Sequence, residues 1–314
     1  MLATLLLQGI FTIVELNAEN LFDCVHDSLK QDYDFLPTSA YKWTHTRYWR
    51  KVNRIGQVIV ASTDSTVKQL PDLVALCEVE NDSVLTDLTR KSLLRGAYYS
   101  YVMTHSPDLR GIDVALLYCP YTFNLLSSHS IRIPHLKEFG PTRDILYAKG
   151  VTAYDDTLHV FVVHAPSRTG GELVSRPYRM LVAGTLLQSI DSVRSLQPEA
   201  NIIVTGDFND YSDDKPLRRL TSNGLTELSK DARGLHVARG TYRYHGLWGS
   251  LDHIFISGPW SKLCQQCYVF DASYLLEPDT KYGGYKPRRN YQGPKYLNGF
   301  SDHLPLVTVF KGEP

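Results

Sequence analysis

Short runs of apolar and β-branched residues recur along the chain, and they predict buried β-strands. Val, Ile, Phe and Tyr dominate these runs, and such residues are enriched in strands. The nine runs cover residues 11–16, 72–79, 98–104, 113–118, 159–165, 201–208, 250–257, 267–270 and 304–310. Three other segments, residues 47–61, 83–94 and 177–196, repeat apolar residues at helical spacing. The alternation predicts one α/β domain whose helices lie outside its sheets.

Local signals mark the ends of two of these helices. Asp82 and Ser83 are candidate caps for the helix over 83–94. Pro177 suits the first turn of the helix over 177–196, because a missing N–H costs little there. The segment 24–50 is long and irregular, and connections of that length are often functional.

The composition is that of an ordinary globular protein. The chain has 314 residues, 43% of them hydrophobic, and its formal net charge is zero. A protein that binds long nucleic acids by charge alone is usually basic overall. A nucleic-acid-binding site in this protein would therefore need a local basic patch. Of the five cysteines, Cys264 and Cys267 form one CxxC pair. A structural zinc site usually needs a second pair, so we interpret these cysteines as scattered structural thiols.

The N-terminus is apolar but too short to span a membrane. It lacks the basic region of a signal peptide, so we expect residues 1–10 to be a lead segment, a signal remnant if the protein is exported. Residues 11–312 are expected to form the domain. With no later stretch that could cross a bilayer, the sequence predicts a soluble protein of undetermined compartment and oligomeric state.

Polar side chains stand where six of the predicted strands end or begin. A single Asp or Asn there would be ordinary turn chemistry, but catalytic groups also concentrate at strand ends. A buried strand cannot end in unpartnered charge, so carboxylates at these places face either solvent or something positive. The set is Asn17, Glu78, His164, Asp207, Asn209, Asp252, Asp302 and His303.

The motifs around these residues resemble those of the endonuclease/exonuclease/phosphatase superfamily of metal-dependent phosphoesterases. They are "LNAENLF", "LCEVEN", "VVHAPSR", "GDFND", "LDHIF" and "SDHLP", in that order, spread over nearly the whole chain. The resemblance implies a four-layer α/β sandwich, in which two packed, mostly antiparallel mixed β-sheets are flanked by helices. Leu16 and Cys77 replace the family's usual Trp and Gln, without any change of charge.

The resemblance also implies roles for the matching residues. Asn17, Glu78 and Asp302 would form the metal site. Oxygen donors of this kind suit Mg²⁺ or Mn²⁺. The catalytic set would be His164, Asp207, Asn209, Asp252 and His303. Asp207 would activate water, His164, Asn209 and His303 would contact the phosphate, and Asp252 would orient His303.

Several further residues have less distinctive signals. Arg110, Arg168, Arg288 and Arg289 are candidate substrate-binding residues, because guanidinium forks suit phosphate. The last two lie in residues 281–300, a basic and tyrosine-rich stretch that suits a phosphate track or simply a solvated loop. In one branch of the superfamily an acid at the position of Asp113 would pair with His164. Glu19, Asp23 and Asp210 are interpreted as surface or turn residues.

The function predicted from the sequence is therefore metal-dependent hydrolysis of a phosphoester by water attack on phosphorus. A phosphodiesterase or nuclease is favoured, with nucleic acid as one candidate substrate. The alternative is a phosphomonoesterase or a lipid head-group phosphodiesterase of the inositol phosphatase or sphingomyelinase type, which the net charge of zero favours. A catalytically silent binding module is a third hypothesis, against which the intact motifs argue.

Overall fold

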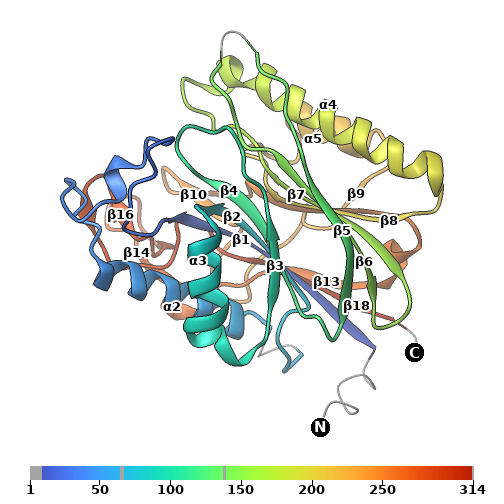
Figure 1. Ribbon diagram of the computed structural model, residues 1–314, viewed down its shortest axis with the longest axis horizontal. Coiled ribbons are helices and arrows are strands. Elements are labelled where there is room, and N and C mark those ends of the chain that lie inside the picture. The colour runs from blue at the N-terminus through green and yellow to red at the C-terminus, as the bar shows by residue number, and fades with distance from the viewer. Residues whose placement is uncertain (1–8, 64–66, 137–138, 313–314) are drawn as a thin grey trace.

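Two six-stranded β-sheets form the centre of the computed structural model, which describes residues 9–63, 67–136 and 139–312 (Figure 1). In spatial order the first sheet contains β13 (Cys264–Val269), β18 (Leu306–Lys311), β1 (Ile10–Leu21), β2 (Leu73–Val79), β4 (Asp113–Tyr118) and β3 (Ser100–Met103). The second contains β5 (Phe123–Ile131), β6 (Ile145–Thr152), β7 (Thr157–His164), β8 (Asn201–Asp207), β12 (Asp252–Ser257) and β9 (Thr226–Glu227). Residues 1–8 of the expected lead segment lie outside the described residues.

Both sheets are mixed but mostly antiparallel. Within them, β1 pairs with β2 and β7 pairs with β8 in parallel, and the other pairs are antiparallel. The central strands are buried on both faces, which explains their near-continuous apolar sequences. Apolar side chains of β1, β2, β4, β7 and β12 belong to one core, which also includes side chains of α2 (His45–Ala61).

Helices cover the outer faces of the two sheets (Figure 1). On the first sheet lie α2 (His45–Ala61) and α3 (Asp82–Thr86), which continues into a π-helical turn, Asp87–Lys91, and a 3-10 turn, Leu93–Gly96. On the second lie α4 (Glu172–Leu196) and α5 (Lys215–Thr221). Further 3-10 turns span Tyr33–Phe35, Pro259–Leu263 and Ser273–Leu275. The layers run helix, sheet, sheet, helix, which confirms the expected α/β sandwich.

Three small hairpins lie outside the main sheets. They are formed by β10 (Tyr242–Tyr244) with β11 (Leu247–Gly249), β14 (Leu276–Pro278) with β15 (Tyr285–Pro287), and β16 (Tyr291–Gln292) with β17 (Lys295–Tyr296). The irregular segment before α2 lies beside β16 at the left of Figure 1, where the Tyr41 and Tyr291 rings are 5.1 Å apart between centroids. Two segments far apart in sequence therefore form one edge of the molecule.

All nine predicted strands are present, but the sequence pattern missed β5, β6 and the two-residue β9 of the second sheet. Most of β5 is exposed and polar because it is the edge strand of the second sheet, so it lacks the apolar alternation of a half-buried strand. The same pattern missed the three hairpins, whose strands are only two or three residues long. Short edge elements bury too few side chains to leave a periodic signal.

Two of the predicted helices have different limits in the structure. The helix expected over 83–94 is α-helical only to Thr86 and continues as the π-helical and 3-10 turns, and its cap is Asn81, whose side chain accepts a hydrogen bond from the Val84 N–H at 2.9 Å. The helix expected to begin at Pro177 begins at Glu172. A proline near the start of a helix withdraws only one hydrogen bond, here to the Leu173 carbonyl, so one more turn precedes it.

Candidate active site

Strand register brings three of the predicted catalytic residues into one row. In the second sheet His164 on β7 pairs with Asp207 on β8, and Asp207 pairs with Asp252 on β12. Residues opposite one another in a sheet point to the same face. All three side chains are buried. All three lie at the edge of the sheet that the strand ends form, because β7 and β8 end there and β12 begins there.

Gly206 lets β7 and β8 approach closely just before Asp207. Its φ is +138°, and a Cβ at this position would lie 1.9 Å from the carbonyl oxygen of Val163. No residue with a side chain fits there. The glycine of the "GDFN" motif is thus required by the strand pairing that places Asp207 beside His164.

Two neighbours fix both oxygens of the Asp207 carboxylate. The Asn17 side-chain amide donates to Oδ2 at 3.0 Å, and the backbone N–H of Asn209 donates to Oδ1 at 2.8 Å. Burial raises the pKa of Asp207 to about 7, and the negative charge of Asp252 contributes in the same direction. A carboxyl group with a pKa in this range can both accept and release a proton near neutral pH.

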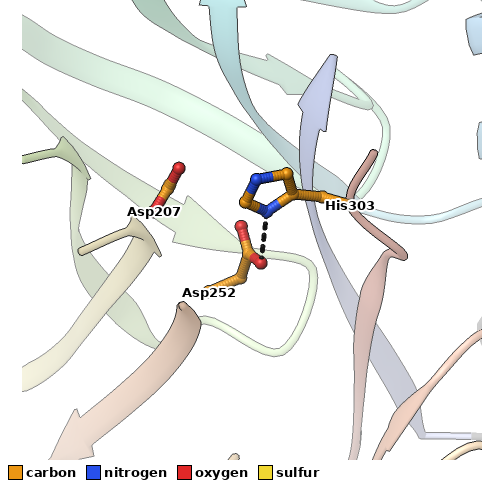
Figure 2. Close-up of side chains that lie close together, drawn as sticks. All are labelled: Asp207, Asp252 and His303. Carbon is orange, nitrogen blue, oxygen red and sulfur yellow. Dashed lines mark hydrogen bonds and ion pairs between the residues drawn. The ribbon is translucent and has the colours of Figure 1, made fainter. Parts of the chain in front are cut away.

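His303 and Asp252 form a buried pair beside Asp207, as Figure 2 shows. The Nδ1–H of His303 donates to Asp252 Oδ2 at 2.7 Å, and the Thr241 hydroxyl donates to the same oxygen. Burial lowers the pKa of His303, but the charge and hydrogen bond of Asp252 outweigh it and hold the pKa well above its ordinary value. The imidazolium form of His303 is therefore favoured.

The pKa of His164 shifts in the opposite direction from that of His303. Burial and the charge of Arg143 lower the pKa of His164 well below its ordinary value. Its Nε2 lies 3.8 Å from Glu78 Oε1 and 3.7 Å from Asp207 Oδ2, and its Nδ1 has no hydrogen-bond partner among the described residues. Two histidines whose pKa values shift in opposite directions thus flank one carboxylate.

The pairing of Asp113 with His164 is not present. The Asp113 carboxylate instead accepts hydrogen bonds from the Thr104 hydroxyl at 2.5 Å and from the Ser106 N–H at 3.0 Å. It begins β4 in the first sheet, whereas His164 ends β7 in the second. Asp113 therefore anchors the loop that precedes β4 rather than orienting an imidazole.

Four carboxylates line one hollow of about 190 Å³ at this edge, together with His164 and His303. They are Glu19, Glu78, Asp207 and Asp302. Burial and the charge of Asp302 raise the pKa of Glu19 to about 7. Arg289 partly balances this charge, because its guanidinium lies 3.1 Å from Asp302 Oδ2 and 3.4 Å from Glu19 Oε1.

This donor set fits a hard divalent cation. Several carboxylate oxygens share a partly buried hollow, and their mutual repulsion is what a bound cation would relieve. Glu78 and Asp302, both predicted ligands, lie in the hollow. Asn17 has other partners, since its amide donates to Asp207 and its oxygen accepts from the Glu19 N–H at 2.9 Å. In this arrangement Asn17 orients Asp207.

The four candidate substrate arginines occupy different places. Arg110 and Arg289 line the hollow. Arg168 does not, because it pairs with Asp214 at 2.7 Å and packs over the Tyr211 ring. Arg288 lies over the Phe300 ring, 5.9 Å from its centroid. The structure thus places two of the four beside the predicted catalytic residues.

Sequence reasoning missed Glu19 and Tyr242. Glu19 is buried and lines the hollow, although its position in a polar loop-like motif suggested a turn residue. Its φ is +49°, so β1 is irregular at this residue, and the sequence pattern of the motif does not indicate this irregularity. Tyr242 reaches the hollow only because the β10 hairpin bridges to His303. The aromatic-rich segment 242–248 is the one local signal for this contact.

Asp210, interpreted from the sequence as a loop residue, forms a buried ion pair with Arg179 of α4. Its side chain is fully buried and lies 2.7 Å from Arg179 Nε, in a pair that also buries Arg179 completely. The Asp210 backbone carbonyl accepts a hydrogen bond from His253 Nε2 at 2.9 Å. The pair ties α4 to the loop that carries Asn209, so it supports the site from behind.

Replacing Arg179 with Met is expected to lower the free energy of unfolding by about 3–5 kcal/mol, because it removes the nearer of the two arginines that pair with the buried Asp210 carboxylate and leaves only Arg168, 3.6 Å away. Urea unfolding followed by circular dichroism measures the change. Arg176→Met is the matched control, since Arg176 pairs with Glu172 nearer the surface, where solvent screens the pair, and this substitution should have a much smaller effect. Equal effects of the two substitutions would contradict the role assigned to the buried pair.

Comparison with known proteins agrees with this architecture. The family model described as "Endonuclease/Exonuclease/phosphatase family" matches residues 12–311. No curated protein matches the sequence. No helix among the described residues is long and apolar enough to cross a membrane.

Solved structures share the fold at low sequence identity. A mannosyl-6-phosphatase from Bacteroides thetaiotaomicron is 16% identical with a TM-score of 0.64, over 95% of this chain and 98% of that one. Truncated TDP2 from Caenorhabditis elegans is 15% identical with a TM-score of 0.61, over 96% and 98%. A protein of unknown function from Enterococcus faecalis is 15% identical with a TM-score of 0.63, over 96% and 100%.

The family match spans nearly the whole chain, and it includes the strands that carry the motifs and the helices that flank them. The chain therefore belongs to the endonuclease/exonuclease/phosphatase family.

Proposed function

We propose that this protein is a metal-dependent hydrolase that cleaves a phosphodiester by attack of water on phosphorus. The observation that carries the proposal is the position of Asp207. Its buried carboxyl, with a pKa near 7, lies between neutral His164 and the protonated His303–Asp252 pair, at the wall of a hollow. A base and a cation facing one small hollow suit the addition of water to an anionic ester.

In this mechanism Asp207 accepts a proton from the attacking water. The hydrogen bonds from Asn17 and Asn209 hold its two oxygens, so the carboxylate keeps one orientation during the reaction. General-base assistance of this kind contributes about 10²–10⁴-fold to the rate. Burial helps as well, because the elevated pKa makes Asp207 a stronger base than a solvated carboxylate.

His303 and His164 stabilise the charge that develops on the phosphoryl oxygens. The Nε2–H of His303 is free to donate because Nδ1–H is directed at Asp252. His303 adds a positive charge, whereas the neutral His164 adds only a hydrogen bond. Arg289 and Arg110, on the same wall, bind the remaining ester oxygens.

Glu78 and Asp302, assisted by Glu19, would hold the divalent cation. Bound there, Mg²⁺ or Mn²⁺ supplies Lewis-acid polarisation of the ester. The oxygen-only donor set among these three residues favours such hard ions over thiolate-binding metals.

A phosphodiester is favoured by the edge of the site that the β10–β11 hairpin forms. Tyr242 of this hairpin lines the hollow, and beyond it the exposed Tyr244 ring stacks on His245 at 4.0 Å between centroids. His245 in turn lies 5.6 Å from the Tyr282 ring, in the basic and tyrosine-rich stretch. Exposed rings in series suit stacking of the bases on either side of a cleaved bond.

A phosphomonoesterase is the second candidate. One structural neighbour is a mannosyl-6-phosphatase, and the formal net charge of zero gives long polyanions no general attraction. A lipid head-group phosphodiesterase would use the same catalytic residues. The geometry of the hollow by itself is compatible with phosphodiesters, phosphomonoesters and lipid head-group esters.

A substrate panel tests the proposal. Purified protein is assayed with Mg²⁺, with Mn²⁺ and with EDTA on plasmid DNA, single-stranded RNA, inositol polyphosphates, phospholipid head groups and bis-p-nitrophenyl phosphate. Metal-dependent turnover of diesters supports the proposal, whereas turnover of monoesters alone supports the second candidate. Folded protein without any turnover would overturn both.

Metal binding is expected to strengthen as the pH rises through about 7. In the metal-free protein Glu19 and Asp207 have raised pKa values of about 7, so between about pH 4 and 7 the folded state holds protons that the unfolded chain has released. These two groups therefore make the free energy of unfolding fall with pH, and a cation reverses this by displacing the protons. The increase in Tm on adding Mg²⁺ should be larger at about pH 8 than at about pH 5.5. An increase that is larger at the lower pH would contradict this linkage.

A further inference from the structure

A second hollow of about 270 Å³ adjoins the catalytic one. The two share Glu19, Asn20, Arg110 and Arg289 as a common wall. A phosphate held by the two arginines would therefore stand at the boundary, with its ester group free to enter the second hollow. None of the catalytic residues predicted from the sequence lines it.

The walls of this second hollow combine aromatic rings with polar side chains. We call it the ring pocket, lined by Phe22, Gln31, Asp34, Phe35, Tyr41 and Tyr291 in addition to the shared wall. Phe22 and Phe35 stack with centroids 4.0 Å apart, and the Tyr41 ring lies 6.1 Å from that of Phe35. Gln31 and Asp34 are exposed, and no hydrogen bond of either side chain is found among the described residues.

Contacts on both sides hold the pocket in place. The Tyr291 hydroxyl donates to the Tyr41 carbonyl at 3.0 Å, and the Glu19 carboxylate accepts from the Asn290 N–H at 2.6 Å. On the other side Lys30 donates to the carbonyls of Ser106 and Asp108 at 2.8 and 2.9 Å. The irregular segment before α2 is thus fastened to both neighbouring loops, so the pocket is formed before any ligand binds.

Its size and chemistry indicate the class of ligand. At about 30 Å³ for each water molecule, the volume corresponds to about nine waters, which is the size of one ring with its substituents. Aromatic faces bind the flat face of a ring, and the side chains of Gln31 and Asp34 can bond to polar groups at its edge. Opposed charges on the wall, Glu19 and Asp34 against Arg110 and Arg289, suit a neutral ring next to an anion.

We infer that the ring pocket binds a single neutral, hydrogen-bonding ring, either a nucleobase or a sugar, that is joined to the phosphate held by Arg110 and Arg289. This inference rests on the proposed function and adds the identity of the group beside the phosphate. It makes the irregular segment before α2 a specificity element. A simple alkyl phosphate leaves the pocket unfilled and binds correspondingly less well.

Inhibition of methyl p-nitrophenyl phosphate hydrolysis tests the inference. The competitors are adenosine 5′-monophosphate, glucose 6-phosphate, glycerol 3-phosphate and inorganic phosphate, each titrated against the wild type in Mg²⁺. We expect at least one ring-bearing phosphate to compete about tenfold better than glycerol 3-phosphate, since stacking of one base contributes about 1–3 kcal/mol. Preference for the nucleotide identifies a base and preference for glucose 6-phosphate identifies a sugar.

Two variants locate the preference in the pocket. Tyr41→Ala and the double variant Gln31→Ala/Asp34→Ala should each weaken the preferred ring-bearing competitor about tenfold and change inhibition by inorganic phosphate less than twofold. Tyr33→Ala is the matched control, because Tyr33 is an exposed tyrosine of the same segment that does not line the pocket. Equal competition by ring-bearing and alkyl phosphates, or unchanged inhibition in both variants, would overturn the inference. Absence of methyl p-nitrophenyl phosphate turnover in the wild type would instead count against the proposed function.

Discussion

Asp207→Asn is expected to lower kcat by about 10²–10⁴-fold, the largest loss that a single substitution should cause in this protein. The amide cannot take a proton from water, but its oxygen can still accept the hydrogen bond from the Asn209 N–H. Burial already favours the neutral form of this carboxyl, so the main structural cost of the amide is the hydrogen bond from the Asn17 side chain, which an NH2 group cannot accept. Steady-state kinetics in Mg²⁺ on bis-p-nitrophenyl phosphate measures the effect, and thermal unfolding confirms that the variant is folded.

A nearby control separates lost chemistry from lost charge. Asp213→Asn removes one negative charge from an exposed position in the loop that follows Asn209, and it should leave kcat within twofold. The wild-type rate should also rise with pH toward about 7 as Asp207 loses its proton, with a midpoint at or below that value when a cation is bound. A fully active Asp207→Asn protein would remove Asp207 from the role of base.

His303→Gln is expected to lower kcat by about 10²–10³-fold, which is the cost of removing one donor aimed at developing negative charge. The wild-type rate should decline at high pH as His303 loses its proton, because its pKa is held well above the ordinary value. In His303→Gln this alkaline decline should disappear, since glutamine does not titrate. The measurement is a pH profile of kcat, with exposed His135→Gln as the control that should match the wild type.

The substitution Asp252→Asn tests the origin of the positive charge on His303. It keeps the imidazole but removes the carboxylate 2.7 Å from Nδ1, so the alkaline decline should move to lower pH. An alkaline decline that stays in place would show that some other group controls it. The two variants together distinguish a catalytic imidazolium from a histidine that only fills the edge of the core.

Most of the fold was predictable because its central strands are buried on both faces. A strand that is buried on both faces needs a nearly continuous run of apolar residues. Such runs can be recognised in β1, β2, β7, β8 and β12 without knowing which strands pair. The edge strand β5 and the short hairpins carry no such demand, so their sequences did not reveal them. The early start of α4 escaped notice for a related reason, because a proline in the second turn looks like a proline at the first position.

The predicted site residues were identified from motifs, but their partners were not. Asp207, Asp252 and His303 converge as expected, and their catalytic roles stay predictions. Asp113 was given the wrong partner because its position relative to β4 says nothing about which loop folds back onto it. Glu19 was not predicted as a site residue because its neighbours in the site, Arg289 and Asp302, are nearly the whole chain away in sequence.

The sequence by itself determined which residue types stand at the strand ends, and with them the class of chemistry: oxygen donors, two imidazoles and a base. This follows because strand burial is a local property and each motif is contiguous. Only the tertiary structure decided the opposite directions in which the pKa values of His164 and His303 shift, the pairing of Arg289 with Asp302 and the existence of the ring pocket. Those depend on burial and on distances between segments far apart in the chain, and electrostatic energy follows distance in space rather than in sequence.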